Sequence, residues 1–300
     1  MKADSKLAKK IESGDFIVTA EHLPHAAADG SMTEAALKAL GSKPLAVNVA
    51  DNHCGVAMSS LAASVAVMKS GAEPVFQVVT RDSNRIALQA NLLGAAYLGI
   101  KNVLCLSGYH QTLMYPESAN VYDIDSTQFI ALATKMAEAG VLADGTKIGG
   151  AFSMLVGAVA NPFMKPLELN MLRLSQKVGA GAKFIQTHAV FDVETFGQWL
   201  GAARKEGITK KAAILAGVLP LENAAEAEKL RDTYTDHYIP DDVVKRLKAA
   251  GDNNAQKKEG LAICVETIKK LKEMDDLRGI HILSGGKEKA VPEILAAAGL

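Results

Sequence analysis

The sequence repeats one structural pattern eight times, and this repetition constrains the fold more than any other feature. Short apolar runs rich in β-branched residues alternate with longer stretches in which apolar residues recur at helical spacing. Several of the helical stretches end in glycine, a common C-terminal cap. The runs that we predict to be strands cover residues 16–21, 45–50, 74–80, 102–107, 147–154, 182–188, 212–218 and 279–285.

Eight such repeats within 300 residues are typical of a (β/α)8 barrel, the TIM barrel. The main alternative is a doubly wound open sheet, which would carry a glycine-rich dinucleotide loop after its first strand. No G-x-G-x-x-G motif follows residues 16–21. We therefore expect a TIM barrel that forms a single domain over residues 1–300, with its extra length in residues 108–125 and 219–260.

Composition argues against several classes of protein. The chain has 33 basic and 33 acidic residues, and no basic run is interleaved with aromatic residues, so nothing indicates a nucleic-acid-binding surface. Cys54, Cys105 and Cys264 are far apart and show no CxxC spacing, which argues against a disulfide scaffold or a zinc ribbon. The first residues resemble neither a signal peptide nor a membrane anchor, so we expect a cytoplasmic protein with no membrane span.

The ends of the predicted strands are where functional side chains should collect, because TIM-barrel active sites lie at the carboxyl ends of the strands. Polar or turn-forming residues occur at each of these ends. They are residues 21–22, 51–53, 80–82, 107–110, 161–162, 186–188, 220 and 284–286.

Glu21 is the first of these candidates. It follows a β-branched strand, and partial burial there would raise the pKa of its carboxyl toward a value useful for a general acid. The alternative is a structural role, as a helix N-cap or in a surface ion pair. The position alone leaves both readings open.

A second cluster lies at residues 80–85. Asp82 or Ser83 is predicted to cap the following helix. Arg81 and Arg85 would place two positive charges near the start of that helix, an arrangement suited to a phosphate or a carboxylate. The structural and the anion-binding readings are compatible.

Histidines and a cysteine near strand ends raise the question of a metal site, since imidazole and thiolate are the usual zinc ligands. These residues are His53, Cys54, His110 and His188. No two of them stand four residues apart on one predicted helix or form a CxxC motif. We therefore expect no bound metal.

Seven segments, in order along the chain, carry a resemblance to a known family. They are VTAEHLP, VNVADN, QVVTRDSNRIALQANLLGAAYLGIKNVLCLSG, VGAVANPF, KVGAGAKFIQTHAVFD, AGVLPL and GIHILSGGKEKAVPEILAAAGL. Each segment alone is modest evidence, but together they cover most of the chain. The ordered series resembles the methylenetetrahydrofolate reductase family.

The resemblance implies a flavin-containing barrel that reduces 5,10-methylenetetrahydrofolate to 5-methyltetrahydrofolate, with the hydride passing through the flavin N5. Glu21 matches the acid of the family, which would donate a proton to a folate nitrogen and so form the electrophilic iminium. FAD is favoured over FMN, and the substrate is a tetrahydrofolate-type pterin. Electrons would come from NAD(P)H or from a partner subunit, and we expect a homo-oligomer.

The resemblance also implies which residues bind the cofactor and the substrate. Lys177 and the loop predicted over residues 157–162 match flavin-contacting positions, and Gln77 matches a contact to the flavin ring. The cofactor-binding residues are Gln77, Thr80, Ser107, Tyr109, Ala158, Asn161 and Lys177. The substrate-binding residues are Tyr109, Gln186 and His188.

Three positions depart from the pattern of the family. Tyr109 stands where the family usually has an Asp that touches flavin and pterin, His188 stands where it usually has Gln, and Asn170 aligns with an acidic residue. Tyrosine can hydrogen-bond and stack on a ring, but it supplies no negative charge at neutral pH. Three functions therefore stay open: the reductase, a flavin-free folate-binding or methyltransferase-like paralogue, and an accessory subunit of a redox complex.

Overall fold

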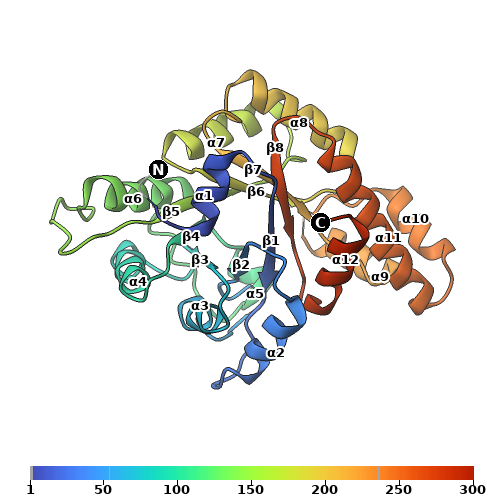
Figure 1. The fold of residues 1–300 in the computed structure, drawn as a ribbon, viewed down its shortest axis with the longest axis horizontal. Helices are drawn as coiled ribbons and strands as arrows, with labels where there is room; N and C mark the ends of the chain where they lie inside the picture. The colour runs from blue at the N-terminus through green and yellow to red at the C-terminus, as the bar shows by residue number, and fades with distance from the viewer. Residues whose placement is uncertain (1–2, 54, 235–236) are drawn as a thin grey trace.

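Eight parallel strands close into a barrel in the order β1 to β8, and helices surround it (Figure 1). The structure is a computed structural model that describes residues 3–53, 55–234 and 237–300. The strands are β1 Ile17–His22, β2 Ala46–Val49, β3 Pro74–Val79, β4 Asn102–Leu106, β5 Leu155–Ala160, β6 Phe184–Ala189, β7 Ala213–Val218 and β8 Leu277–Ile282. The predicted TIM barrel is confirmed.

Helices follow the strands and cover the outside of the barrel (Figure 1). They are α1 Lys6–Ser13, α2 Ser31–Leu40, α3 Ser60–Lys69, α4 Arg85–Tyr97, α5 Gln111–Met114, α6 Ser126–Ala139, α7 Leu167–Gly179, α8 Val193–Lys205, α9 Ala224–Thr233, α10 Asp241–Ala249, α11 Asn253–Lys272 and α12 Val291–Ala297, with a 3-10 turn η1 at Glu288–Ala290. The extra length lies where we predicted it. The α5 segment occupies the connection after β4, and α9 and α10 precede the helix before β8.

The fifth strand is the one whose predicted position is wrong. Residues 147–154 form an irregular segment with a single bridge between Lys147 and Val141, and β5 begins only at Leu155. Gly149 and Gly150 lie in the predicted run, and Gly150 has a left-handed backbone with φ of 80°. Glycine weakens a strand interior, so the ladder forms in the LVGAVA run that follows. The loop that we predicted over residues 157–162 is therefore mostly strand.

Helix α1 closes the amino-terminal end of the barrel. Leu7 and Ala8 are fully buried in a cluster with the first inward-facing residues of the strands. The first backbone N–H groups of a helix lack intrahelical partners, and Glu73 accepts hydrogen bonds from those of Lys6 and Leu7 at 2.7 and 2.9 Å. The same carboxylate accepts the side-chain amide of Asn102 at 3.0 Å, which ties this floor to the start of β4.

The interior of the barrel changes from apolar to polar on the way from this floor to the mouth. The lower level includes Val75, Leu155 and Phe184, which are buried together. Gly157 leaves room for the Phe184 ring, because a Cβ placed at residue 157 would lie 2.2 Å from Phe184 Cζ. Side chains alternate along a strand, so the next inward positions lie two residues further on. The polar side chains at this level are Thr19, Asn48, Gln77, Gln186 and His281, all buried.

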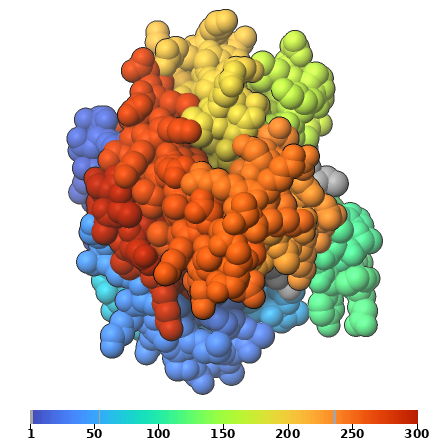
Figure 2. Space-filling view, turned by 90° about the vertical axis from the view of Figure 1, so that its right-hand side faces the viewer, coloured from blue at the N-terminus to red at the C-terminus, as the bar shows by residue number. Residues whose placement is uncertain are grey.

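The segment between β7 and β8 forms a broad side of the molecule. Figure 2 shows this side, with the orange residues of α9 to α11 over its centre and the blue residues of the first repeats below them. The apolar side chains of α9 and α10 pack with Leu219 and Leu221 in a separate buried cluster beside the barrel. None of the described helices combines the length and the apolar character that crossing a bilayer requires.

Candidate active site

Glu21 lies near the mouth of the barrel, two residues beyond Thr19 on the inner face of β1. Its side chain is 7% exposed and accepts a hydrogen bond from the backbone N–H of Gly285, in the loop after β8. Burial raises the pKa of the Glu21 carboxyl to about 7, and the negative charge of Glu288 acts in the same direction. A carboxyl with this pKa is still half protonated near neutral pH, so it can act as a general acid.

A layer of paired polar side chains lies below Glu21. Asn48 donates to Gln186 Oε1 at 2.6 Å, and Gln186 Nε2 donates to Asn48 Oδ1 at 3.0 Å and to Thr19 Oγ1 at 3.1 Å. Thr19 Oγ1 also contacts His281 Nδ1 at 2.9 Å. Burial lowers the pKa of His281 to about 3, so this imidazole is neutral. Gln186, which we predicted to bind substrate, thus forms part of an internal network whose members satisfy one another.

The end of β3 carries two of the predicted cofactor-binding residues. Gln77 faces the barrel interior and is 8% exposed, while Thr80 is completely buried. Among the described residues, no hydrogen-bond partner is found for the Thr80 hydroxyl. An unpaired buried hydroxyl is unfavourable, and a bound ligand is one way to satisfy it.

Arg81 fastens three loops together. Its guanidinium donates two hydrogen bonds to Asp82, both at 2.7 Å, and reaches the backbone oxygens of Asn52 and Tyr109 at 3.1 and 3.3 Å. With these hydrogen bonds, the buried guanidinium connects the loops after β2, β3 and β4. Its charge is already matched by a carboxylate.

Arg85 is also matched by a carboxylate, because it forms two hydrogen bonds to Asp123 at 2.7 and 3.0 Å. The anion site that we inferred from Arg81 and Arg85 is therefore not supported. The predicted cap is wrong as well. Asn84 caps α4 by accepting the N–H groups of Ile86 and Ala87.

Tyr109 and His188 lie in a cluster of aromatic rings above the barrel. The Tyr109 hydroxyl is 3.4 Å from His237 Nε2, and its ring centroid is 5.0 Å from that of Tyr234. His188 is edge-on to His237 at 6.1 Å, and His53 is edge-on to Tyr109 at the same distance. The loops after β2, β4 and α9 and the end of β6 thus meet here, and their rings can stack on a flat ligand and hydrogen-bond to its edge.

Strand β6 is irregular where it enters this cluster. The register with β7 shifts between Gln186 and Ala189, and the Thr187 hydroxyl accepts the backbone N–H of Gly217 at 2.9 Å. A bulge of this kind redirects a side chain at the rim of a barrel. His188 is consequently half-buried at the rim, whereas Gln186 stays inside.

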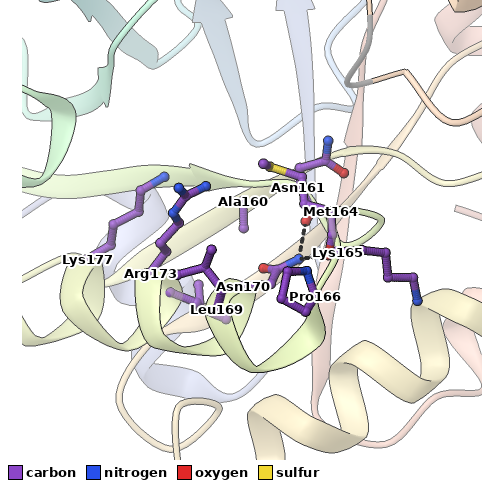
Figure 3. Close-up of a pocket in the computed structure, with 10 residues that line it drawn as sticks. Ala160, Asn161, Met164, Lys165, Pro166, Leu169, Asn170, Arg173 and Lys177 are labelled. Carbon is purple, nitrogen blue, oxygen red and sulfur yellow. Dashed lines mark hydrogen bonds between the residues drawn. The ribbon is translucent and has the colours of Figure 1, made fainter.

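A cavity of about 130 Å³ lies between the end of β5 and α7 (Figure 3). Lys177 and Arg173 extend along α7 on one side of it, and Asn161 lies opposite (Figure 3). Burial lowers the pKa of Lys177, and the nearby Arg173 charge contributes. No carboxylate is among the described residues that line the cavity, so it suits an anion. They are Ala160, Asn161, Met164, Lys165, Pro166, Leu169, Asn170, Arg173, Leu174 and Lys177.

Asn170 holds the wall of this cavity in place. Its amide donates to the backbone oxygens of Asn161 and Met164 at 2.7 and 3.1 Å, as Figure 3 shows, and its oxygen accepts Trp199 Nε1 at 3.2 Å. An aspartate here could not donate either of the first two hydrogen bonds. The departure from an acidic residue therefore has a structural explanation.

Two other residues that we predicted to contact the cofactor, Ala158 and Ser107, do not line the cavity. Ala158 is fully buried between the barrel and the surrounding helices, so its side chain belongs to the core, and Ala160 lines the cavity instead. Ser107 is half-buried, and its backbone oxygen accepts the N–H of Arg81 at 3.0 Å. Within the described part of the chain, no group of three His, Cys, Asp or Glu side chains is placed to hold a metal ion, and Cys54 lies outside that part.

Asp51, predicted at the end of the second strand without an assigned role, accepts the N–H of Val79 at 3.0 Å. Burial, together with the charge of Asp82, raises its pKa to about 6. Two other site residues were missed from the sequence. Asn48 and His281 were overlooked inside apolar runs. Their signal was a single polar residue at an inward position of a strand, as also occurs at Gln77 and Gln186.

A model of one protein family matches nearly the whole chain. It is described as methylenetetrahydrofolate reductase, and it covers residues 6–299. A probable methylenetetrahydrofolate reductase (NADPH) of Caenorhabditis elegans is 24% identical over 268 residues, which are 87% of this chain and 36% of that protein. Methylenetetrahydrofolate reductase 2 of Saccharomyces cerevisiae is 30% identical over 132 residues, 44% of this chain and 22% of the yeast protein. The chain thus spans about a third or less of these two relatives.

Solved structures with the same fold include a protein from Clostridium thermocellum that binds two copies of 5-methyl-5,6,7,8-tetrahydrofolic acid. The two chains align with a TM-score of 0.67 over 98% of each, at 13% identity. A 2,3-dimethylmalate lyase aligns with a TM-score of 0.51 over 98% of this chain and 87% of the lyase, at 14% identity. At these identities the likeness concerns the fold alone.

Proposed function

The chain belongs to the methylenetetrahydrofolate reductase family, and from this premise we propose that it is a flavin-dependent oxidoreductase of one-carbon metabolism. Its reaction is the reduction of 5,10-methylenetetrahydrofolate to 5-methyltetrahydrofolate. The observation that carries the proposal is Glu21, a buried carboxyl at the mouth of the barrel whose pKa is raised to about 7.

Glu21 supplies the proton that this reaction requires. Opening the methylene bridge needs a proton on a folate nitrogen, because the nitrogen must become a leaving group before the iminium can form. A carboxyl with an ordinary pKa would be almost fully ionised at pH 7, whereas the raised pKa keeps a large fraction protonated. The hydrogen bond from Gly285 holds this carboxyl at the rim, where the substrate would enter.

The residues around the mouth fit a flavin. Lys177 and Arg173 face an anion-compatible cavity suited to the phosphates, and Asn161 lies on its opposite wall. Gln77 and the unpaired hydroxyl of Thr80 offer hydrogen bonds to a ring. When bound, the flavin would deliver the hydride to the one-carbon unit. FAD is preferred to FMN on the resemblance to the family.

The rings of Tyr109 and His188 form the proposed pterin pocket. A pterin is flat and carries hydrogen-bonding atoms along its edge, which matches a cluster of tyrosine and histidine rings. The reduced folate bound by the Clostridium thermocellum protein supports this class of ligand. The substrate is therefore a tetrahydrofolate-type pterin.

Other parts of the proposal rest on the sequence. The electrons come from NAD(P)H or from a partner subunit. The protein works in the cytoplasm, in keeping with the buried free thiols of Cys105 and Cys264. A single domain over residues 1–300 and a homo-oligomer stay predictions.

The test of this function uses the complete chain. Purified protein is titrated with FAD and, separately, with FMN, and the visible spectrum reports binding. Reduced holoenzyme is then mixed anaerobically with 5,10-methylenetetrahydrofolate. We expect a bound flavin whose absorbance returns as 5-methyltetrahydrofolate forms. Binding of neither flavin would refute the proposal.

A second candidate, a flavin-free folate-binding or methyltransferase-like protein, is favoured by one observation. Lys177 Nζ donates to the backbone oxygen of Val159 at 2.6 Å, so part of its hydrogen-bonding capacity is already used. Calorimetry separates the two functions, because this candidate requires that 5-methyltetrahydrofolate bind to protein that takes up no flavin. An accessory subunit of a redox complex is the third candidate, and turnover of the isolated chain with a reduced viologen would exclude it.

A further inference from the structure

Helix α4 carries an apolar stripe on the outside of the barrel. The stripe consists of Ile86, Ala90, Leu93 and Tyr97, and we call these four residues the α4 seam. Ile86 is 75% exposed, Tyr97 is 90% exposed, and Ala90 is also exposed, while Leu93 is half-buried. The residues follow one another at intervals of four, three and four positions, so they lie on one face of the helix. The a and d positions that join the helices of a coiled coil have the same spacing.

The surface around the α4 seam carries little charge. Helices α3 and α4 have 10 and 13 residues, and their charged residues are Lys69, at the end of α3, and Arg85, at the start of α4. Arg85 pairs with Asp123. By contrast, five of the nine residues of α10 are charged. A partner with an acidic or a basic surface meets no opposite charge along the seam, whereas an identical uncharged surface meets no repulsion there.

Helices α3 and α4 lie side by side on this part of the barrel (Figure 1). A Cβ placed at Gly94 would lie 3.8 Å from Cδ2 of Leu61, and one placed at Gly99 would lie 3.4 Å from Cε of Met68. At a rise of about 1.5 Å per residue and a width of about 10 Å per helix, the outer surface of the two helices measures about 350 Å². An interface of standard size buries about 800 Å² on each partner. The surface therefore suits an association of modest affinity.

The α4 seam is complementary to itself when two copies of the helix run in opposite directions. A two-fold axis through the middle of the seam places Ile86 of one copy opposite Tyr97 of the other, and Ala90 opposite Leu93. The small Ala90 lies near the axis, where it lets the two helices approach closely. We propose that the α4 seam is the contact between two copies of this chain, which form a dimer about this axis.

The proposed contact leaves both mouths of the barrels open. Helix α4 follows β3 and precedes β4, so it runs from the mouth of the barrel back to its floor. Two antiparallel copies of α4 therefore point the two mouths in opposite directions. Because the contact lies outside the candidate active site, the dimer does not depend on the proposed function.

Sedimentation velocity of the complete chain from about 1 to about 200 µM tests the proposal. For wild type we expect a monomer–dimer equilibrium with a Kd of about 10 µM or below. Tyr97→Glu places a charge in the seam and should raise this Kd at least about a hundredfold. The control Leu172→Glu changes another exposed apolar residue, on α7, and should dimerise like wild type. A wild type that is monomeric at about 200 µM, or a Kd that is unchanged in Tyr97→Glu, overturns the proposal.

A mixing experiment tests the antiparallel register. Ile86→Lys alone should also raise the Kd at least about a hundredfold. In an equal mixture of Ile86→Lys and Tyr97→Glu, the introduced lysine of one copy lies opposite the introduced glutamate of the other, and the other end of the seam keeps its natural pair. The mixture should therefore dimerise with a Kd within about tenfold of wild type, and a mixture that stays monomeric contradicts the proposed register. If one variant does not fold, the other is compared with wild type and Leu172→Glu, and an unchanged Kd in it overturns the proposal.

Discussion

The side-chain amides of Asn48 and Gln186 hydrogen-bond to each other in both directions inside the barrel, at 2.6 and 3.0 Å. The residues lie on β2 and β6, 138 positions apart in the chain. Both side-chain amides are buried where water cannot reach them, so each provides the hydrogen-bond partner that the other needs. This pair completes the polar layer below Glu21, so the acid lies on a rigid set of side chains.

Breaking the amide pair should destabilise the fold. Asn48→Leu or Gln186→Leu leaves a buried amide without its partner, which we expect to cost about 2 kcal/mol in the free energy of unfolding. The double variant should lose less than the sum of the two, with a coupling of about 1 kcal/mol. Urea denaturation measures the free energy of unfolding of each variant, with the exposed Gln198→Leu as control. If the losses of the two single variants simply add in the double variant, the two amides do not stabilise each other.

Glu21 should make the protein less stable at alkaline pH. The pKa of its carboxyl is about 7 in the folded protein against an ordinary value of 4.5, so between these values the folded state binds more protons than the unfolded state. Stability therefore falls as the pH rises through this window. Glu21→Gln lacks this titrating carboxyl, so its stability should not show this fall. Relative to wild type, its free energy of unfolding should therefore be higher at pH 8 than at pH 5 by about 3 kcal/mol. The exposed Glu194→Gln is the control, and a gain independent of pH would count against the raised pKa.

Lys177 should contribute to cofactor affinity. Lys177→Met keeps an apolar side chain of similar length and removes the positive charge beside the cavity. We expect the Kd for FAD to rise by about ten- to a hundredfold, because a hydrogen bond to a charged group contributes about 1.5–3 kcal/mol. Titration followed by flavin absorbance measures this, with the exposed Lys205→Met on α8 as control. The same Kd for FAD in Lys177→Met and in the control would show that Lys177 does not bind the cofactor.

The barrel was predictable because its signal is local. Every apolar run between two helical stretches is visible in the sequence, and only the strand around LVGAVA was misplaced, where small residues and the preceding Gly149 and Gly150 blur the pattern. The position of Glu21 at the mouth was also predictable, because a carboxylate at the end of a predicted barrel strand is visible in the sequence, while its role as the acid stays a proposal.

The partners of the site residues were not predictable, because they depend on register and on contacts between distant segments. Gln186 was placed at the mouth, and the structure pairs it with Asn48 inside the barrel. Arg81 looked like an anion ligand, but its guanidinium is bound by the adjacent Asp82. The hydrogen bond from Gly285 to Glu21 requires the closure of β8 onto β1, which no local pattern reports.

The most direct test of the account compares the two half-reactions of Glu21→Gln by stopped-flow absorbance. Reduction of the bound flavin by a chemical donor does not need the Glu21 proton, so its rate should stay within about twofold of wild type. Reoxidation by 5,10-methylenetetrahydrofolate needs that proton, and its rate should fall by at least about a hundredfold. Equal loss in both half-reactions, or normal reoxidation in Glu21→Gln, would contradict the assignment of Glu21 as the acid.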